Sequence, residues 1–156
     1  MRPDRIVVGE VRGEETIDML QAMNTGHDGS LSTGHGNSPL DMLSRLETMV
    51  IMGLDIPVEA IRRQIASGID IMIHLGRLRD KSRKVLEILE IDGYDHRTGE
   101  IMTHTLYAFE EAGEQADGTI TGCLQKKGTL KNKAKLLRSG IIRKEDEEAE
   151  KDETDW

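Results

Sequence analysis

Two side chains near the start of the sequence, Glu10 and Arg12, are of types that support phosphoryl transfer. They follow residues 5–9, an apolar run that ends at Gly9 and is typical of a strand buried on both faces in a parallel sheet. A carboxylate at the carboxyl end of such a strand lies where open α/β sheets bind ligands, and it can orient or deprotonate an attacking water. Glu10 is therefore a candidate catalytic group and Arg12 a candidate cation. The alternative is that Glu10 caps the next helix and Arg12 makes a surface ion pair.

A second polar cluster surrounds a predicted strand at residues 30–33, with His27 before it and Thr33 and His35 at its far end. A fully extended strand would separate the two histidines by up to about 25 Å, so we predict no shared metal ion. His35 lies at the end of the strand nearer to Glu10, where it could contact a phosphate with Thr33 donating a hydroxyl. A purely structural histidine is the alternative.

The elements that must position these side chains alternate between helices and strands in the first half of the chain, which predicts an α/β architecture. Apolar residues at helical spacing predict helices over 14–24, from Ser38 and Pro39 onward, and from Pro57 to Gly68. We expect 69–73 to be a further apolar strand. Residues 84–91 and 100–109 predict an antiparallel extension, followed by a turn-rich segment over 113–128 and a short helix over 130–137.

Charge is unevenly distributed near the end of the chain. Residues 126–144 carry eight basic and no acidic side chains, and residues 145–156 carry eight acidic and one basic side chain. The basic stretch has no interleaved aromatic residues and adjoins a run that repels phosphates, so we predict no nucleic-acid binding. Residues 141–156 are expected to be a charged, disordered tail. No apolar run approaches the roughly 20 residues of a membrane span, and the single cysteine, Cys123, fits a reducing cytoplasm.

Several motifs occur in the order found in one family. RPDRIVVGEVRG at residues 2–13 and DMLQAMNTGHDGSLSTGH at residues 18–35 resemble the Walker B region and histidine box of the type II/type IV secretion ATPases. The resemblance continues through 44–49, 62–68 and 74–80, covers residues 1–140, and is strongest to the branch that assembles tight-adherence (Flp) pili.

This resemblance implies a RecA-like P-loop NTPase core, with residues 1–140 as the C-terminal part of the domain. It implies ATP and Mg²⁺ as ligands of the full-length protein, which would form a homo-hexameric ring. Its expected partners are platform proteins at the cytoplasmic face of the inner membrane. Glu10, Arg12 and His35 would be the catalytic residues. Gly9, His27 and Thr33 would contact the nucleotide.

A phosphate-binding loop, the Walker A motif, is missing from these 156 residues. The nearest imitation, Asp80-Lys81-Ser82, has an aspartate in the place of the required glycine, and its carboxylate would repel phosphate. We therefore expect the chain to be a portion of an ATPase motor for pilus assembly or protein secretion, and to hydrolyse ATP negligibly in isolation. The alternative is a binding or assembly module that docks on complete ATPase subunits or on the membrane platform without turning over nucleotide.

Overall fold

The structure, a computed structural model, describes residues 3–27 and 29–142. In chain order its elements are β1 (Val7–Val8), α1 (Thr16–Asn24), β2 (Leu31–Ser32), α2 (Pro39–Gly53), α3 (Val58–Gly68), β3 (Ile71–Arg77), β4 (Arg83–Asp95), β5 (Glu100–Glu114), β6 (Ile120–Lys126) and α4 (Ala134–Arg138).

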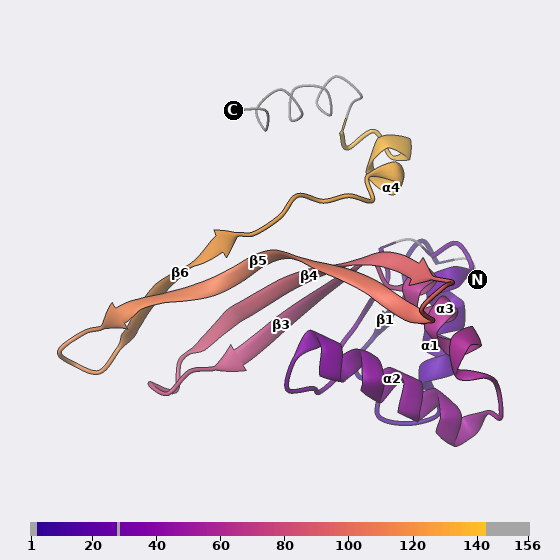
Figure 1. Cartoon of the computed structure of the whole chain (residues 1–156), viewed down its shortest axis with the longest axis horizontal. Helices are drawn as coiled ribbons and strands as arrows, with labels where there is room; N and C mark the ends of the chain where they lie inside the picture. Colours follow the sequence, from indigo (N-terminus) through magenta and orange to yellow (C-terminus); the bar gives the residue numbers. More distant parts are fainter. Residues whose placement is uncertain (1–2, 28, 143–156) are drawn as a thin grey trace.

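These strands form two separate sheets. β1 and β2 are parallel neighbours, whereas β3 to β6 form an antiparallel meander in sequential order. The meander extends away from α1, α2 and α3, which lie together at its other end (Figure 1). The α/β class and the antiparallel extension are confirmed. The extension is larger than predicted because β3 also belongs to it.

Local capping chemistry fixes two of the predicted helix ends. The Ser38 hydroxyl accepts a hydrogen bond from the backbone N–H of Asp41 at 3.1 Å, and Pro39 occupies the first turn of α2. Just after the C-terminal end of α1, Gly26 has a φ of 86°, a left-handed conformation that glycine adopts without steric cost. The predicted helix start at Ser38 and Pro39 and the predicted helix end at residue 24 are confirmed.

The hydrophobic core lies around α3, which contacts α1, α2, β4 and β5. Ile61 and Ile65 are fully buried there, as their helical spacing predicts. Val58, at the first position of the same helix, is 36% exposed, so the apolar face of α3 is not buried along its whole length.

Two further expectations about burial and turns are corrected. Val7 is 73% exposed, so β1 is not buried on both faces. Among the residues that the structure describes, its sheet has one other short strand. Residues 113–128 are mostly strand and not turn, because two of the glycines that suggested turns lie within paired strands. Gly113 lies at a register shift between β5 and β6. At Gly122 a Cβ atom would lie 2.4 Å from the Glu110 carbonyl oxygen, which leaves no room for a larger side chain.

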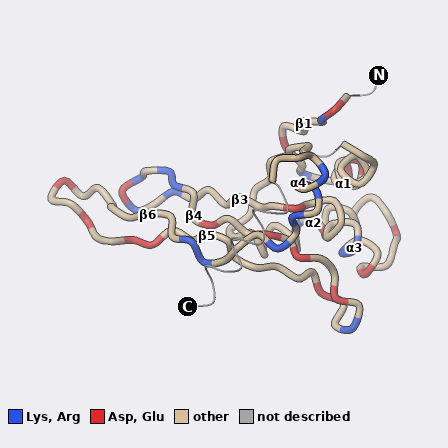
Figure 2. The backbone as a smooth tube through the Cα atoms, turned by 90° about the horizontal axis from the view of Figure 1, so that it is seen from above, with Lys and Arg blue, Asp and Glu red and all other residues tan. Residues whose placement is uncertain are grey.

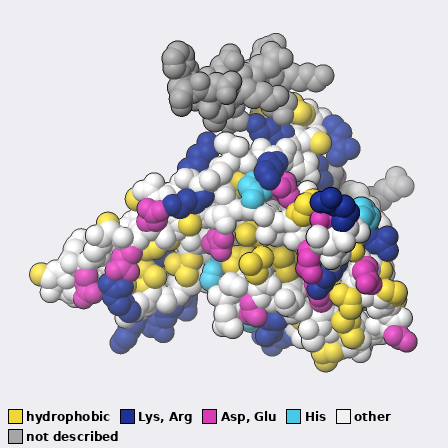
Figure 3. Space-filling view, in the orientation of Figure 1, with side chains coloured by type: hydrophobic (Ala, Val, Ile, Leu, Met, Phe, Trp, Pro, Cys, Tyr) yellow, Lys and Arg dark blue, Asp and Glu magenta, His cyan; other side chains and the backbone are white. Residues whose placement is uncertain are grey.

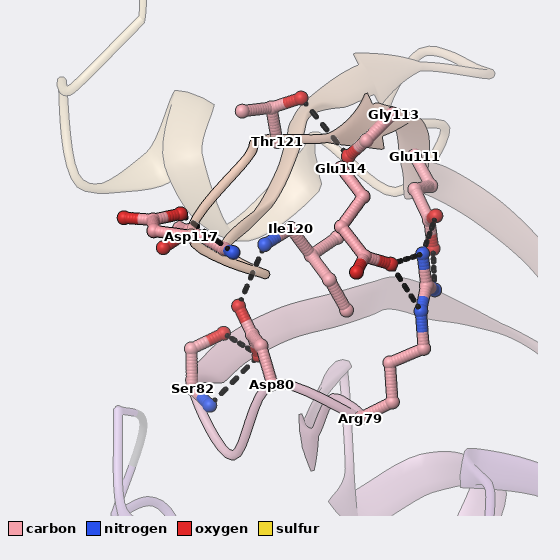
Figure 4. Close-up of polar contacts among 10 residues, drawn as sticks. Arg79, Asp80, Ser82, Glu111, Gly113, Glu114, Asp117, Ile120 and Thr121 are labelled. Atoms are coloured by element: carbon pink, nitrogen blue, oxygen red, sulfur yellow. Dashed lines mark hydrogen bonds and ion pairs between the residues drawn. The ribbon is translucent and has the colours of Figure 1, made fainter.

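The far end of the meander is held by charged side chains from the turn between β3 and β4. The Arg79 guanidinium donates to both carboxylate oxygens of Glu111, at 2.6 and 2.5 Å, and pairs with Glu114 at 3.1 Å. Asp80 accepts the backbone N–H of Ile120 at 2.8 Å and both the N–H and the hydroxyl of Ser82 (Figure 4). Figure 2 shows the basic positions of the β3–β4 turn, in blue, near the acidic positions of the β5–β6 hairpin, in red. Arg79 and Asp80 therefore join the two hairpins, and the imitation phosphate loop is a structural turn.

We predict that this junction weakens in acid because its hydrogen bonds favour the ionised Asp80 carboxylate. Donation from the Ile120 N–H, and then from Ser82, lowers the Asp80 pKa. The contribution to stability is therefore present above the unfolded pKa of about 3.9 and is lost as the pH falls through the lower folded pKa. Asp80→Asn should reduce the exchange protection of the Ile120 amide at neutral pH and remove its acid dependence, measured by NMR hydrogen exchange. Asp95→Asn, in the opposite turn, is the control and should leave Ile120 unchanged.

None of the helices within the described ranges is long and apolar enough to cross a membrane. The charged tail predicted for residues 141–156 lies outside the described residues from position 143 onward.

Candidate functional site

Glu10, Arg12 and His35 come together just beyond the first sheet. The Arg12 Nη2 atom lies 2.5 Å from Glu10 Oε2, and the His35 Nε2 atom lies 2.9 Å from Glu10 Oε1. The Glu10 side chain is 22% exposed, while the other two side chains are largely open to solvent. The three residues predicted from the sequence to be catalytic thus form one cluster around a half-buried carboxylate.

The parallel pairing of β1 and β2 produces this arrangement. Val7 is opposite Leu31 and Val8 is opposite Ser32, so the residues that follow both strands meet at the same edge. There the Thr33 hydroxyl donates to the Gly9 carbonyl at 2.5 Å. The backbone continues the pairing, because the N–H of Val11 donates to the Thr33 carbonyl at 3.1 Å. Thr33 therefore ties the loop after β2 to the loop that carries Glu10.

The loop between Glu10 and α1 is held by a different carboxylate. Glu15 Oε1 accepts the backbone N–H groups of Arg12 at 2.7 Å and of Gly13 at 3.2 Å. The Thr16 hydroxyl donates to the Gly13 carbonyl at 2.7 Å. Glu10 makes none of these contacts, so the alternative in which it caps the next helix is wrong. Its carboxylate faces Arg12 and His35 instead.

Electrostatics keep the Glu10 carboxylate ionised. The hydrogen bond from Arg12 is the main cause of its lowered pKa. Desolvation opposes this effect, and electrostatic attraction to Arg12 and His35 lowers the pKa further. Glu10 in turn raises the pKa of the Arg12 guanidinium. At neutral pH the cluster therefore offers a negatively charged acceptor beside a permanent cation, a combination that can hold a water molecule next to a phosphoryl group.

His27 lies apart from this cluster. Its Nδ1 atom is 3.1 Å from the carbonyl oxygen of Ala22, in the last turn of α1. His27, Thr33 and His35 all line one cavity of about 720 Å³ beside β2. His27 thus has a structural contact of its own, at the end of β2 opposite to His35. The two histidines share the cavity but not a cluster.

A second polar group, absent from the sequence predictions, lies on β4 and β5. Glu90 is almost fully buried, and its carboxylate accepts the backbone N–H groups of Lys131 at 2.9 Å and Asn132 at 2.7 Å. His104 Nε2 lies 3.0 Å from the same carboxylate. Asp92 pairs with the Lys131 ammonium group at 2.5 Å. The i, i+2 spacing of the two acids was the available signal, since it places them on one face of a strand.

This polar group anchors the basic segment that follows β6. Lys127 pairs with Glu110, and Lys135 pairs with Asp70 at 2.7 Å. Three lysines of the segment thus face carboxylates of the same chain, counting the pair between Lys131 and Asp92. The side chains of Glu90, Asp92 and His104 lie close enough together to surround a metal ion. However, the Lys131 ammonium group already pairs with Asp92, and the Glu90 carboxylate already accepts two backbone N–H groups. We therefore interpret the group as a structural anchor.

Comparisons with known proteins all identify proteins of secretion or conjugal transfer systems. A family model described as "Type II/IV secretion system protein" matches residues 1–149. A putative conjugal transfer protein of Mycobacterium tuberculosis is 43% identical over 88 residues, which cover 56% of this chain and 25% of the relative. The conjugal transfer protein TrbB of Rhizobium radiobacter is 37% identical over 94 residues, covering 60% of this chain and 28% of the relative.

A solved structure also resembles the chain. The VirB11 ATPase from the Brucella suis type IV secretion system, crystallised with sulphate, aligns with a TM-score of 0.53 at 32% identity over 56% of this chain and 28% of its own. The α/β class agrees with that structure. The chain spans only about a quarter of the length of the first relatives it matches.

Proposed function

The chain belongs to the type II/IV secretion system ATPase family, and we propose that it carries the catalytic carboxylate and the histidine contact of an ATP site in such a motor. One observation carries this proposal: the ionised Glu10 carboxylate lies between Arg12 and His35 where two parallel strands end. Glu10 would orient and deprotonate the attacking water, and Arg12 would supply positive charge. His35 would respond to the terminal phosphate.

Nucleotide would enter as its Mg²⁺ complex, and we assign no protein ligand of the ion to this chain. Gly9 and Thr33 would shape the loop against which the phosphates lie, because their hydrogen bond fixes the backbone beside Glu10. Substrate phosphates would also need a cradle of backbone N–H groups and a lysine, and these 156 residues contain no such motif. We therefore propose that the isolated chain does not turn over ATP.

In the assembled motor, we propose a RecA-like core arranged as a hexameric ring at the cytoplasmic face of the inner membrane, working on pilus or secretion platform proteins. The support is the family match and the likeness to a secretion ATPase structure. The assignment to the Flp pilus branch rests on the sequence motifs at residues 2–13 and 18–35.

The test compares the two histidines in a chimaera in which residues 1–149 replace the corresponding part of the mycobacterial relative. His35→Ala should lower ATP turnover by about tenfold or more, because the contact with the Glu10 carboxylate is lost. His27→Ala should leave turnover within about twofold, because its ring contacts the end of α1. Turnover is measured by phosphate release at saturating MgATP. Equal losses in the two variants, or none in His35→Ala, would overturn the assignment of His35.

A further inference from the structure

The connection between α2 and α3 exposes a group of apolar side chains. Met52, Leu54 and Val58 belong to this short stretch, and their exposed fractions are 71, 40 and 36%. Figure 3 shows hydrophobic side chains at the lower right of the molecule, where α2 ends and α3 begins in Figure 1. Single exposed apolar residues are common on proteins, whereas a group of them with a polar rim marks a contact surface. We call residues 52–58 the corner.

An acidic hollow adjoins the corner. This cavity of about 320 Å³ is lined by Ile17 and Asp18 of α1 and by Gly53 and Leu54 of the corner, among others. Asp18 is exposed and has no ion pair among the residues that the structure describes. Because α2 ends at Gly53, the negative end of its dipole adds to the field in the hollow. The hollow therefore favours a positively charged side chain, and its volume is sufficient for one arginine.

The end of α4 carries the opposite charge on the same chain. Arg138 is exposed in the last turn of this helix and has no ion pair within the described ranges. Ile141 follows it and is 71% exposed. The Ile141 N–H donates to the Leu136 carbonyl at 3.1 Å, and Gly140 has a φ of 70°, so a capped helix end presents Ile141. Arg138 and Ile141 thus form a basic and apolar pair on a defined turn.

These two surfaces lie on opposite sides of the molecule. In Figure 1 α4 is at the top, beyond the meander, whereas the corner is at the bottom of the helical part. The corner is therefore not covered by the α4 end of its own chain. Contacts between two different, complementary surfaces of identical chains are head-to-tail, and such contacts close into rings or extend into filaments.

We propose that the corner is the acceptor of a head-to-tail contact, and that its occupant is the α4 end of a second copy of this chain. Ile141 of the second copy would pack against Met52 and Leu54, and its Arg138 would enter the hollow beside Asp18. An apolar centre with charged groups at its rim is the usual composition of such an interface. This inference deepens the hexameric ring proposed above and rests on that proposal, but it is independent of the catalytic one.

Pairing of two corners with each other is a poorer solution. It would bring the Asp18 carboxylates of both copies, and the Asp55 carboxylates beside Leu54, toward one another without a cation. It would also leave Arg138 and Ile141 uncovered. The α4 end supplies both the positive charge and the apolar contact that the corner lacks, and this complementarity selects it as the occupant.

Two variants of the 156-residue chain test the proposal, each with one of the two surfaces destroyed. Met52→Asp removes the acceptor, and Ile141→Asp removes the α4 end. We expect the parent chain to self-associate as its concentration rises over about a 100-fold range in analytical ultracentrifugation, and each variant alone to stay monomeric. An equimolar mixture of the variants should form a 1:1 dimer and nothing larger, because one intact acceptor and one intact α4 end remain.

Three outcomes would overturn the proposal: a parent chain that stays monomeric, variants that associate by themselves, or a mixture without the 1:1 dimer. The mixture also checks folding, since the dimer forms only if each variant keeps its remaining surface. Leu40→Asp is the matched control, because Leu40 is 57% exposed at the start of α2, outside the corner. This substitution should leave the association constant within about twofold of the parent value.

An exchange of charges tests the place of Arg138 in the hollow. Asp18→Lys or Arg138→Glu alone should weaken self-association at least about fivefold, whereas the double variant should return to within about twofold of the parent. Circular dichroism checks that all three variants fold. A double variant as weak as the single ones would overturn the pairing of Arg138 with Asp18.

Light scattering of the chimaera with saturating MgATP separates this inference from the ring itself. We expect a ring in the parent chimaera and its loss with Met52→Asp. A ring in both would mean that the subunits meet through another surface, and it would overturn this inference alone. A parent chimaera that forms no ring would overturn the proposed ring as well.

Discussion

Glu10→Gln is expected to lower ATP turnover of the chimaera by at least about 100-fold while nucleotide affinity changes by less than about threefold. Glutamine preserves the size of the side chain and one oxygen acceptor. It removes the negative charge that the lowered pKa maintains at neutral pH. The loss therefore falls on activation of water, a step that a neutral amide cannot perform.

The matched control for this prediction is Glu14→Gln. Glu14 is an exposed carboxylate only four residues away, and it has no contact with Arg12 or His35 among the interactions of the described residues. Steady-state phosphate release measures turnover, and a fluorescent ATP analogue with Mg²⁺ measures binding. A Glu10→Gln chimaera that hydrolyses ATP at the rate of its parent would mean that the water is activated elsewhere, and the ion pair with Arg12 would then be only structural.

The pH dependence of the same chimaera gives an independent check. Because Arg12 lowers the Glu10 pKa, the carboxylate stays charged down to pH values below the ordinary range of a glutamate. Arg12→Met removes the main cause of this shift, so the acidic limb of the turnover profile should move to higher pH. A profile with an unchanged acidic limb would show that a different group sets it.

The parts of the structure that could be predicted from the sequence depend on short-range chemistry. Ser38 begins a helix through a hydrogen bond from a backbone N–H three residues on, and Gly26 follows the end of a helix in a left-handed conformation. The helix bounds predicted at these two places are confirmed. The proximity of Glu10 and His35 was also predictable, because the carboxyl ends of adjacent parallel strands share an edge. The roles of these residues in a reaction stay predictions.

The parts that could not be predicted depend on where distant segments return. Glu90 is buried, and its carboxylate accepts backbone N–H groups of residues 131 and 132, which lie 41 positions or more along the chain. The i, i+2 spacing of Glu90 and Asp92 places both acids on one face of a strand, but it does not predict this distant contact. Gly122 resembles a turn residue until Phe109 and the backbone of the neighbouring strand are placed against it. Likewise, Val7 has the composition of a buried strand, but burial requires a covering layer that its own residues do not specify.

Ile61→Ala is expected to destabilise the chain by about 2–5 kcal/mol, the largest effect we predict for a single core substitution. Ile61 is fully buried on the helix that contacts α1, α2, β4 and β5. Because elements on several sides hold the site open, the neighbours cannot collapse into the cavity left by the missing methyl and methylene groups. The cost therefore includes both the lost transfer free energy and the cavity.

Ile51→Ala on α2 removes the same groups from a side chain that is 48% exposed, and it should cost about 1 kcal/mol or less. Urea unfolding of the 156-residue chain, followed by circular dichroism, measures both changes from the shift in midpoint at constant slope. Equal, small effects would mean that the core around α3 is loosely packed. A large effect of Ile61→Ala alone would mean that this core is well packed in the 156-residue chain by itself.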